Sequence, residues 1–273
     1  MPTVFFRHGP AALLLSFALL VPAPHLNAEE APPRLQHRAP DAAPRAILWV
    51  GNSFFYYNNS LHNHLNRLAA SARHKVSGTS VTISGSGLDW HDMASLLRPD
   101  GLGRYSFVGD NDIRFNPQGR QYDTVIMMDC SQCPVHPKLQ TAFHEAVAKN
   151  ARLLREKGLR PMLFMSWAYQ DKPEMSAALA SQYTQAANAN DLSVIPAGLA
   201  FARVFANDKD INLYESDKRH PSLAGTYLAA CTAFAALYRE SPEGLAYTAG
   251  LPKDVAARLQ AAAWMSVQEY FAP

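Results

Sequence analysis

Three residues of this chain have the types and the sequence context for nucleophilic chemistry. Ser53 directly follows the apolar run and small turn "AILWVGN", while Asp217 and His220 lie three residues apart in "ESDKRHPSLAGTYLAA". A serine hydroxyl is a poor nucleophile until a base, most often histidine, removes its proton, and a carboxylate holds that histidine in the required tautomer. Taken alone, Ser53 fits a turn or helix cap, Asp217 a cap and His220 a surface loop. Taken together, they predict a catalytic Ser-His-Asp triad.

The triad has to be positioned by a fold in which strands and helices alternate. Apolar runs typical of strands covered on both faces are expected at residues 46–50, 81–84, 124–129, 161–167 and 192–196. Helices are expected at residues 60–72, 137–157, 174–190, 198–208, 222–239 and 252–271. This alternation predicts an α/β fold with a mostly parallel sheet of about five strands and helices on both faces. The segment 92–121 is weakly periodic, and we expect a surface insertion with a short hairpin there.

The predicted strand ends bring small and polar residues to one place. In an open parallel sheet, ligands bind beyond the carboxyl ends of the strands. Ser53, Gly85, Asp129 and Trp167 all fall just past predicted strand ends. We therefore expect these four residues to line one rim of the sheet.

The first 45 residues indicate export. Arg7, the apolar stretch "PAALLLSFALLVPA" and the small residues before Glu29 have the pattern of a secretory signal peptide, predicted at 1–28, with an uncleaved anchor helix as the alternative. A flexible Pro- and Ala-rich leader is expected at 29–45 and a single domain at 46–273. The mature protein is expected to be periplasmic or secreted, without stable membrane insertion.

Charge and histidine spacing exclude two classes of function. The chain has 25 Lys and Arg against 23 Asp and Glu and no basic block, so no nucleic-acid partner is predicted. His62 and His64 are two residues apart without acidic residues clustered beside them, so no metal site is predicted either. Length and composition do not determine the oligomeric state.

The cysteines leave several interpretations open. In an oxidising compartment, Cys130 and Cys133 of "CSQC" could form a disulfide, and the same spacing also fits two free thiols or a redox or metal site. Cys231 lies in the apolar stretch "YLAACTAFAALY" and is expected to be a small buried helix residue.

Two blocks of the sequence resemble the SGNH/GDSL hydrolase superfamily. "VGNSFFYYNN" is similar to the first block of that superfamily, with Asn where many members have Asp, and "DKRHPSLAGTYLAA" is similar to the last, D-x-x-H-P followed by a glycine-containing helix. Together with "GLDWH", these blocks resemble an exported bacterial branch. The resemblance implies a flavodoxin-like three-layer α/β/α sandwich in which Ser53 is the nucleophile, His220 the general base and acid, and Asp217 the residue that orients His220.

The resemblance also implies an oxyanion hole with one departure from the family pattern. In the family, the donors are the N–H of the nucleophile, the N–H of a glycine after the second strand and an asparagine side chain after the third. The first two match Ser53 and Gly85, with Gly87 as the runner-up. The third block here reads "MMDCSQCP" and has no asparagine, so a substitute donor is expected from Gln132, Ser131 or Asn52.

These expectations add up to a serine esterase or acyl-hydrolase that forms an acyl-enzyme on Ser53 and needs no cofactor. The family's range implies a small-molecule or carbohydrate ester as substrate, for example a sugar O-acetyl group. An acyltransferase on the same triad, or a binding protein for carbohydrate or lipid whose catalytic site has decayed, are the alternatives. Four residues near the predicted strand ends are expected to line the substrate cleft: Phe54, Trp90, His91 and Asp129.

Overall fold

The computed structural model describes residues 1–3, 33–36, 42–98, 105–107, 113–115 and 122–272. The chain divides into two units, Met1–Ala31 and Pro32–Pro273. Only residues 1–3 of the first unit are described, so the predicted signal peptide and most of the leader lie outside the described residues.

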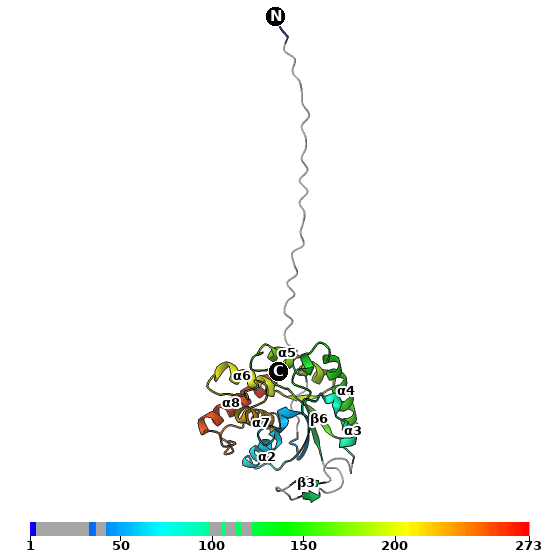
Figure 1. The fold of residues 1–273 in the computed structure, drawn as a ribbon, viewed down its shortest axis with the longest axis vertical. Coiled ribbons are helices and arrows are strands. Elements are labelled where there is room, and N and C mark those ends of the chain that lie inside the picture. Colours follow the sequence, from blue (N-terminus) through cyan, green and yellow to red (C-terminus); the bar gives the residue numbers. More distant parts are fainter. Residues whose placement is uncertain (4–32, 37–41, 99–104, 108–112, 116–121, 273) are drawn as a thin grey trace. The chain divides into compact units, whose positions relative to one another are not determined.

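A five-stranded parallel sheet forms the centre of the second unit (Figure 1). Its strand order is β2-β1-β5-β6-β7, with β1 at Ala46–Gly51, β2 at Ser77–Thr82, β5 at Thr124–Met127, β6 at Arg160–Phe164 and β7 at Ser193–Ile195. In the register, Gly51 pairs with Thr82 and Val50 with Met127, so the carboxyl ends of β1, β2 and β5 lie side by side. The predicted parallel sheet of about five strands is confirmed.

Helices cover both faces of this sheet, as the sequence predicts. Figure 1 shows α2, α7 and α8 on one side and α3 and α4 on the other. The helices are α1 (Ser53–Tyr56), α2 (Leu61–Ser71), α3 (Met93–Leu96), α4 (Gln140–Glu156), α5 (Met175–Ala189), α6 (Ala197–Asn207), α7 (Leu223–Tyr238) and α8 (Lys253–Tyr270), with short 3-10 helices η1 (Leu88–Trp90) and η2 (Cys133–Val135). Among the helices in the described ranges, none combines the length and the hydropathy that a membrane span requires.

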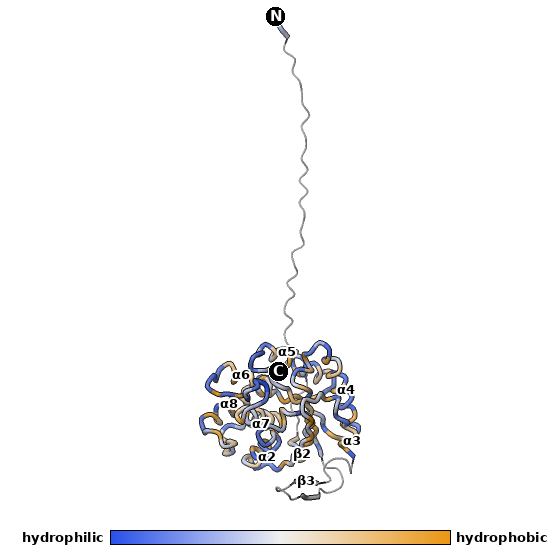
Figure 2. The backbone as a smooth tube through the Cα atoms, viewed as in Figure 1, coloured by the Kyte–Doolittle hydropathy of each residue, from blue (hydrophilic) through white to orange (hydrophobic). Residues whose placement is uncertain are grey.

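Side chains of β1 alternate between two hydrophobic cores, one on each face of the sheet. Ile47 and Trp49 pack under α2, α6, α7 and α8, whereas Leu48 and Val50 pack under α4 and α5. Figure 2 shows hydrophobic stretches along the central strands. A strand buried on both faces has no polar side to display, which is why β1 is a continuous apolar run.

Some element boundaries differ from those predicted. The strand predicted at 81–84 runs from Ser77 to Thr82, because this edge strand of small and polar residues continues the pairing with β1 upstream of the apolar residues. The strands predicted at 124–129 and 161–167 end at Met127 and Phe164, since the chain leaves the sheet there. Within 92–121 the structure has the expected antiparallel hairpin, β3 (Tyr105–Phe107) with β4 (Ile113–Phe115).

Candidate active site

Ser53 is the first residue of α1, immediately beyond the end of β1. Asn52 caps this short helix, since its side-chain oxygen accepts a hydrogen bond from the N–H of Phe54 at 3.2 Å. The capping function that Ser53 could have served therefore belongs to Asn52. The Ser53 hydroxyl is left free to contact a residue from another part of the chain.

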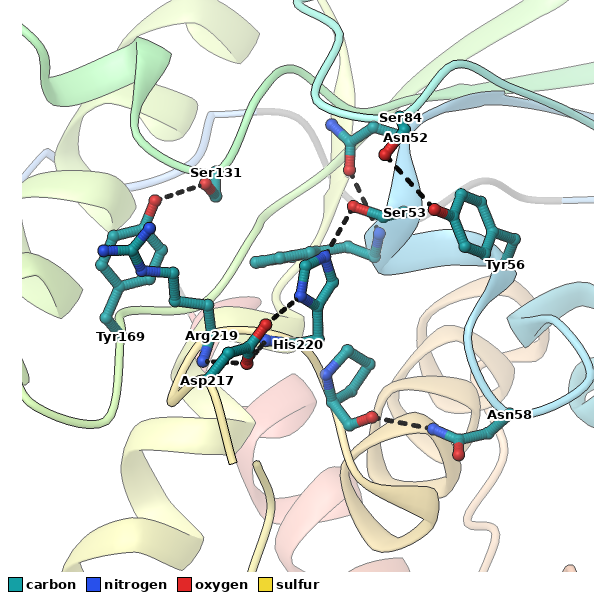
Figure 3. Close-up of polar contacts among 12 residues, drawn as sticks. Asn52, Ser53, Tyr56, Asn58, Ser84, Ser131, Tyr169, Asp217, Arg219 and His220 are labelled. Atoms are coloured by element: carbon teal, nitrogen blue, oxygen red, sulfur yellow. Dashed lines mark hydrogen bonds and ion pairs between the residues drawn. The ribbon is translucent and has the colours of Figure 1, made fainter. Parts of the chain in front are cut away.

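That residue is His220, and Asp217 lies behind it (Figure 3). His220 Nε2 lies 2.8 Å from Ser53 Oγ, and His220 Nδ1 is hydrogen-bonded to Asp217 Oδ2. Ser53 is 6% exposed and His220 is partly buried, so the pair is shielded from bulk water on most sides. The structure brings together the three residues that the sequence singles out, although 167 positions separate Ser53 from His220.

The loop that carries Asp217 and His220 is held by its own backbone. Asp217 Oδ1 accepts hydrogen bonds from the N–H groups of Arg219 and His220, both at 3.0 Å. Burial opposes ionisation of Asp217, but these bonds and the one from the His220 ring outweigh it and lower the pKa of the carboxyl to about 2. Asp217 is therefore an anion at neutral pH, as an orienting residue for histidine must be.

Gly225 of α7 lets the helix approach this loop closely. A Cβ at this position would lie 2.3 Å from the carbonyl oxygen of Leu213, a distance that no side chain can occupy. Leu213 in turn accepts a hydrogen bond from the N–H of Ser222 at 2.9 Å. The glycine in "HPSLAGTYLAA" is therefore needed for packing, because the absence of a side chain lets α7 lie close against the loop that ends at His220.

Two aromatic rings hold the His220 imidazole from different sides. The Tyr57 ring stacks on it with centroids 4.3 Å apart and an interplanar angle of 9°, and Phe54 meets it edge-on at 5.5 Å. These contacts restrict rotation of the imidazole and keep it in the orientation in which Nε2 faces Ser53 Oγ. In the sequence, the aromatic run "FFYY" that follows Ser53 suggests a substrate subsite or core packing, but a contact between Tyr57 and His220 could not be predicted from it.

Gly85 and Gly87, the two glycines expected to offer an oxyanion donor, lie in different surroundings. Gly85 is exposed in the turn after β2, has a φ of +71°, and faces open space where a Cβ would stand. Gly87 is buried, and a Cβ there would lie 2.5 Å from the Asp89 carboxylate and 3.2 Å from that of Asp129. A developing negative charge beside two carboxyl groups would be repelled, so the runner-up is disfavoured.

Asn52 is not available as a substitute oxyanion donor, which corrects one expectation. Its side-chain NH₂ donates to the carbonyl oxygens of Ser86 and Asp129, both at 3.1 Å, and an amide has only two such hydrogens. Of the other two candidates, Gln132 is exposed, and Ser131 Oγ lies 2.7 Å from the hydroxyl of Tyr169. Asn52 instead ties together the loops that follow β1, β2 and β5.

A disulfide closes the loop after β5. Cys130 and Cys133 are joined by an S–S bond, and the N–H of Cys133 also donates to Cys130 Sγ at 2.9 Å. Together with Asp129 these sulfurs form a compact group of metal-ligand types, but sulfur in a disulfide is not the thiolate that binds metal. Cys231 is buried in α7, and burial raises the pKa of its thiol.

Three of the four residues expected in the substrate cleft are buried. Phe54 stacks on Trp167 in the core, His91 Nε2 lies 3.0 Å from the hydroxyl of Ser86, and Asp129 is 3% exposed. Trp167, expected at the rim, is also fully buried, because its flat ring packs between two others. Trp90 alone of the four is exposed, at 63%.

His62 and His64 serve the structure around α2. His64 Nε2 lies 2.6 Å from the carbonyl oxygen of Asn58, and its Nδ1 lies 2.9 Å from the Tyr247 hydroxyl. His62 Nδ1 lies 2.8 Å from Ser60 Oγ, and burial lowers the pKa of His62 to about 4. Both histidines are therefore occupied by hydrogen bonds within the protein.

Asp129→Asn is expected to remove a pH-dependent part of the stability. Burial raises the pKa of the Asp129 carboxyl from 3.8 to about 6, although the N–H groups of Cys130 and Leu88 donate to it. Because the pKa of Asp129 is higher in the folded protein than in the unfolded chain, its protonation stabilises the fold. This stabilisation is complete below the pKa of the unfolded chain and is lost as the pH rises through the pKa of the folded protein. From pH 4.5 to 7.5, the free energy of unfolding of the wild type should fall by about 2 kcal/mol relative to the variant. Urea unfolding at both pH values measures this, and equal changes in the two proteins would contradict it.

The fold of this chain also occurs in a known class of hydrolases. A five-stranded parallel sheet with helices on both faces is the fold that it shares with SGNH and GDSL hydrolases of known structure. No protein-family model matches the sequence, and no curated protein matches it.

Three solved structures illustrate the likeness. A DUF4886 family protein from Bacteroides uniformis is 19% identical, with a TM-score of 0.63 over 83% of this chain and 96% of that one. A provisionally described SGNH hydrolase from Slackia heliotrinireducens is 22% identical, with a TM-score of 0.51 over 71% of this chain and 98% of that one. The acetyl xylan esterase AlAXEase is 11% identical, with a TM-score of 0.51 over 70% of this chain and 99% of that one. At these identities, the likeness is one of fold.

Proposed function

We propose that this chain is an SGNH-type serine esterase that acts through an acyl-enzyme on Ser53. The observation that carries the proposal is the hydrogen-bonded chain from Ser53 Oγ to His220 Nε2 and from His220 Nδ1 to Asp217. It stands at the carboxyl end of a parallel sheet, which is where such folds bind ligands. A catalytically decayed binding protein would have no need to keep these contacts.

The reaction follows from the positions of these atoms. His220 Nε2 takes the Ser53 proton as Oγ attacks the ester carbonyl carbon, and the N–H groups of Ser53 and Gly85 donate to the oxyanion. When the tetrahedral intermediate collapses, the bond to the alcohol oxygen breaks, and His220 delivers its proton to that oxygen. Water then attacks the acyl-enzyme with His220 again as base, which releases the acid and restores Ser53. An acyltransferase would differ in this last step alone, with a sugar hydroxyl in place of water.

Ser131→Ala is expected to lower kcat by about 10²- to 10³-fold, because Ser131 is our candidate for the third oxyanion donor. Its hydroxyl lies 2.7 Å from that of Tyr169, so the tyrosine can donate to Ser131 Oγ and leave the Ser131 hydrogen for the substrate. The neighbouring Gln132→Ala serves as the control and should leave kcat unchanged, since Gln132 is exposed and has no hydrogen bond from its side chain within the described residues. If Gln132→Ala were the slower variant, the assignment would pass to Gln132.

The substrate proposal is an ester of a small molecule or a carbohydrate, such as a sugar O-acetyl group. Support comes from the fold likeness to an acetyl xylan esterase and from the predicted signal peptide, which would deliver the domain at 46–273 to the periplasm or the medium. At that location, ester-modified polysaccharides are accessible substrates.

The test is turnover of p-nitrophenyl acetate and butyrate by residues 29–273, with labelling by a fluorophosphonate in parallel. Turnover together with a single adduct on Ser53, located by mass spectrometry of the digested protein, is the expected result. A folded protein that neither hydrolyses these esters nor reacts with the fluorophosphonate would overturn the esterase proposal.

A further inference from the structure

Arg219 lies directly before His220 and is fixed at its backbone from two directions. Its N–H donates to Asp217 Oδ1 at 3.0 Å, and its carbonyl oxygen accepts a hydrogen bond from Trp167 Nε1, also at 3.0 Å. The Trp167 side chain is fully buried, so this second anchor comes from the core. The backbone of Arg219 is therefore held in place, and only its side chain can change conformation.

The Arg219 guanidinium lies over the ring of Tyr169, 4.8 Å from its centroid. Figure 3 shows the side chain running along Tyr169 and away from the carboxylate of Asp217. Tyr169 is itself buried, and its hydroxyl is hydrogen-bonded to Ser131. The cation thus rests on a fixed aromatic surface, an arrangement that attracts it to the ring and keeps its N–H groups free at the edges.

No acidic side chain neutralises this cation in the part of the chain that the structure describes. Asp217, the nearest carboxylate along the sequence, has both oxygens occupied by His220 and by the two backbone N–H groups. Arg155, Arg203 and Arg258, by contrast, each form an ion pair with an Asp or Glu. An arginine that is held in place on the loop of His220 and has no acid partner among the described residues has the geometry to bind an anion of a ligand.

Three loops at the carboxyl edge of the sheet meet at this position. Ser131 follows β5, Tyr169 follows β6, and Arg219 belongs to the loop that carries His220. A hydrogen bond from the N–H of Gln170 to the carbonyl oxygen of Lys218, at 2.9 Å, joins the last two loops. Arg219 is exposed, and its cation therefore lies on the rim formed by the loops at the carboxyl edge of the sheet, the same edge at which Ser53 follows β1.

We propose that Arg219, supported by Tyr169, binds an anionic group of the substrate, so that the preferred substrates are esters that also carry a carboxylate or a similar anion. This inference rests on the proposed esterase function. The planar guanidinium can donate two parallel hydrogen bonds to a carboxylate, which gives orientation as well as affinity. The anion can belong to the acyl group or to the alcohol, and matched substrates distinguish the two.

The experiment compares kcat/KM for two pairs of esters that differ in charge and hardly in shape. On the acyl side, the pair is the p-nitrophenyl monoester of glutarate and its terminal carboxamide. On the alcohol side, the pair is 3-carboxyphenyl acetate and 3-carbamoylphenyl acetate. In at least one pair, the wild type should prefer the anionic ester by about tenfold or more. The pair that shows the preference identifies the side that carries the anion.

Arg219→Gln should reduce that preference to about one. Lys218→Gln is the matched control. Lys218 is the exposed neighbour of Arg219, so this variant also removes one positive charge, but it should keep the preference for the anionic ester. The ratio of the two kcat/KM values cancels any general loss of activity, and thermal unfolding shows that each variant is folded.

Three results would overturn the inference: no preference in either pair, a preference that survives Arg219→Gln, or an equal loss in Lys218→Gln. The last would show a general effect of surface charge. Turnover of the neutral esters without a charge preference leaves the proposed function standing and removes the inference alone. Failure to turn over any of the four esters removes both.

Discussion

Ser53→Ala abolishes ester turnover, and His220→Ala lowers kcat by about 10⁴-fold or more, if the triad works as proposed. Ser53 supplies the oxygen that forms the acyl-enzyme, and His220 Nε2, 2.8 Å away, is placed to take its proton. Because both changes stop the same step, the double variant should be no slower than either single one. Additive losses would mean that the two residues do not act as a unit.

Asp217→Asn should cost less, about 10³- to 10⁴-fold in kcat. The asparagine oxygen can still accept hydrogen bonds from the N–H groups of Arg219 and His220, so the loop keeps its shape. What is lost is the charge that stabilises the imidazolium and the acceptor that fixes the His220 tautomer.

Initial rates with p-nitrophenyl acetate, measured above the rate of spontaneous hydrolysis, test these variants. Ser77→Ala provides a control, because Ser77 is an exposed serine at the start of β2 and takes no part in the site. If Ser53→Ala retained a tenth of the wild-type rate, Ser53 would not be the nucleophile. The same result for His220→Ala would remove the histidine from the role of base.

Trp167→Ala is expected to lower the free energy of unfolding by about 3–5 kcal/mol. Trp167 is stacked between Phe54, with centroids 4.5 Å apart, and Phe201, at 4.1 Å, and all three rings are buried. Removal of the indole leaves a cavity between two rings that come from α1 and α6 and cannot close together without moving those helices. Urea unfolding measures the loss.

The same variant should also lower kcat, because Trp167 Nε1 donates to the carbonyl oxygen of Arg219, next to His220. Trp167→Phe separates the two effects: it keeps a ring in the stack but leaves that carbonyl without its partner. Its loss of stability should be smaller, about 1–3 kcal/mol, and its kcat should still fall. Trp264→Ala is the matched control, since Trp264 is partly buried on α8 and should affect stability without changing kcat. Unchanged kcat in both Trp167 variants would contradict a positioning role.

The elements buried on both faces could be predicted from the sequence. β1, β5 and β6 are apolar runs because both sides of each strand face a core, and α7 is apolar all round because other helices cover it. The edge strand β2 was placed too late, because one-sided pairing with β1 does not require apolar residues. The triad was predictable because its residue types and motifs are carried by two short segments.

What the sequence could not determine depends on contacts between distant segments. Whether Asn52 could donate to an oxyanion was decided by the carbonyl groups of Ser86 and Asp129, which occupy both of its hydrogens. Whether Phe54 faced the cleft or the core was decided by the stack with Trp167. Arg219 could not be singled out from the sequence, since its position over the Tyr169 ring arises only where two loops meet in the fold. Local residue patterns therefore determined the strands, the helices and the reactive groups, while the hydrogen-bond partners and neighbouring rings of each group follow only from the packed structure.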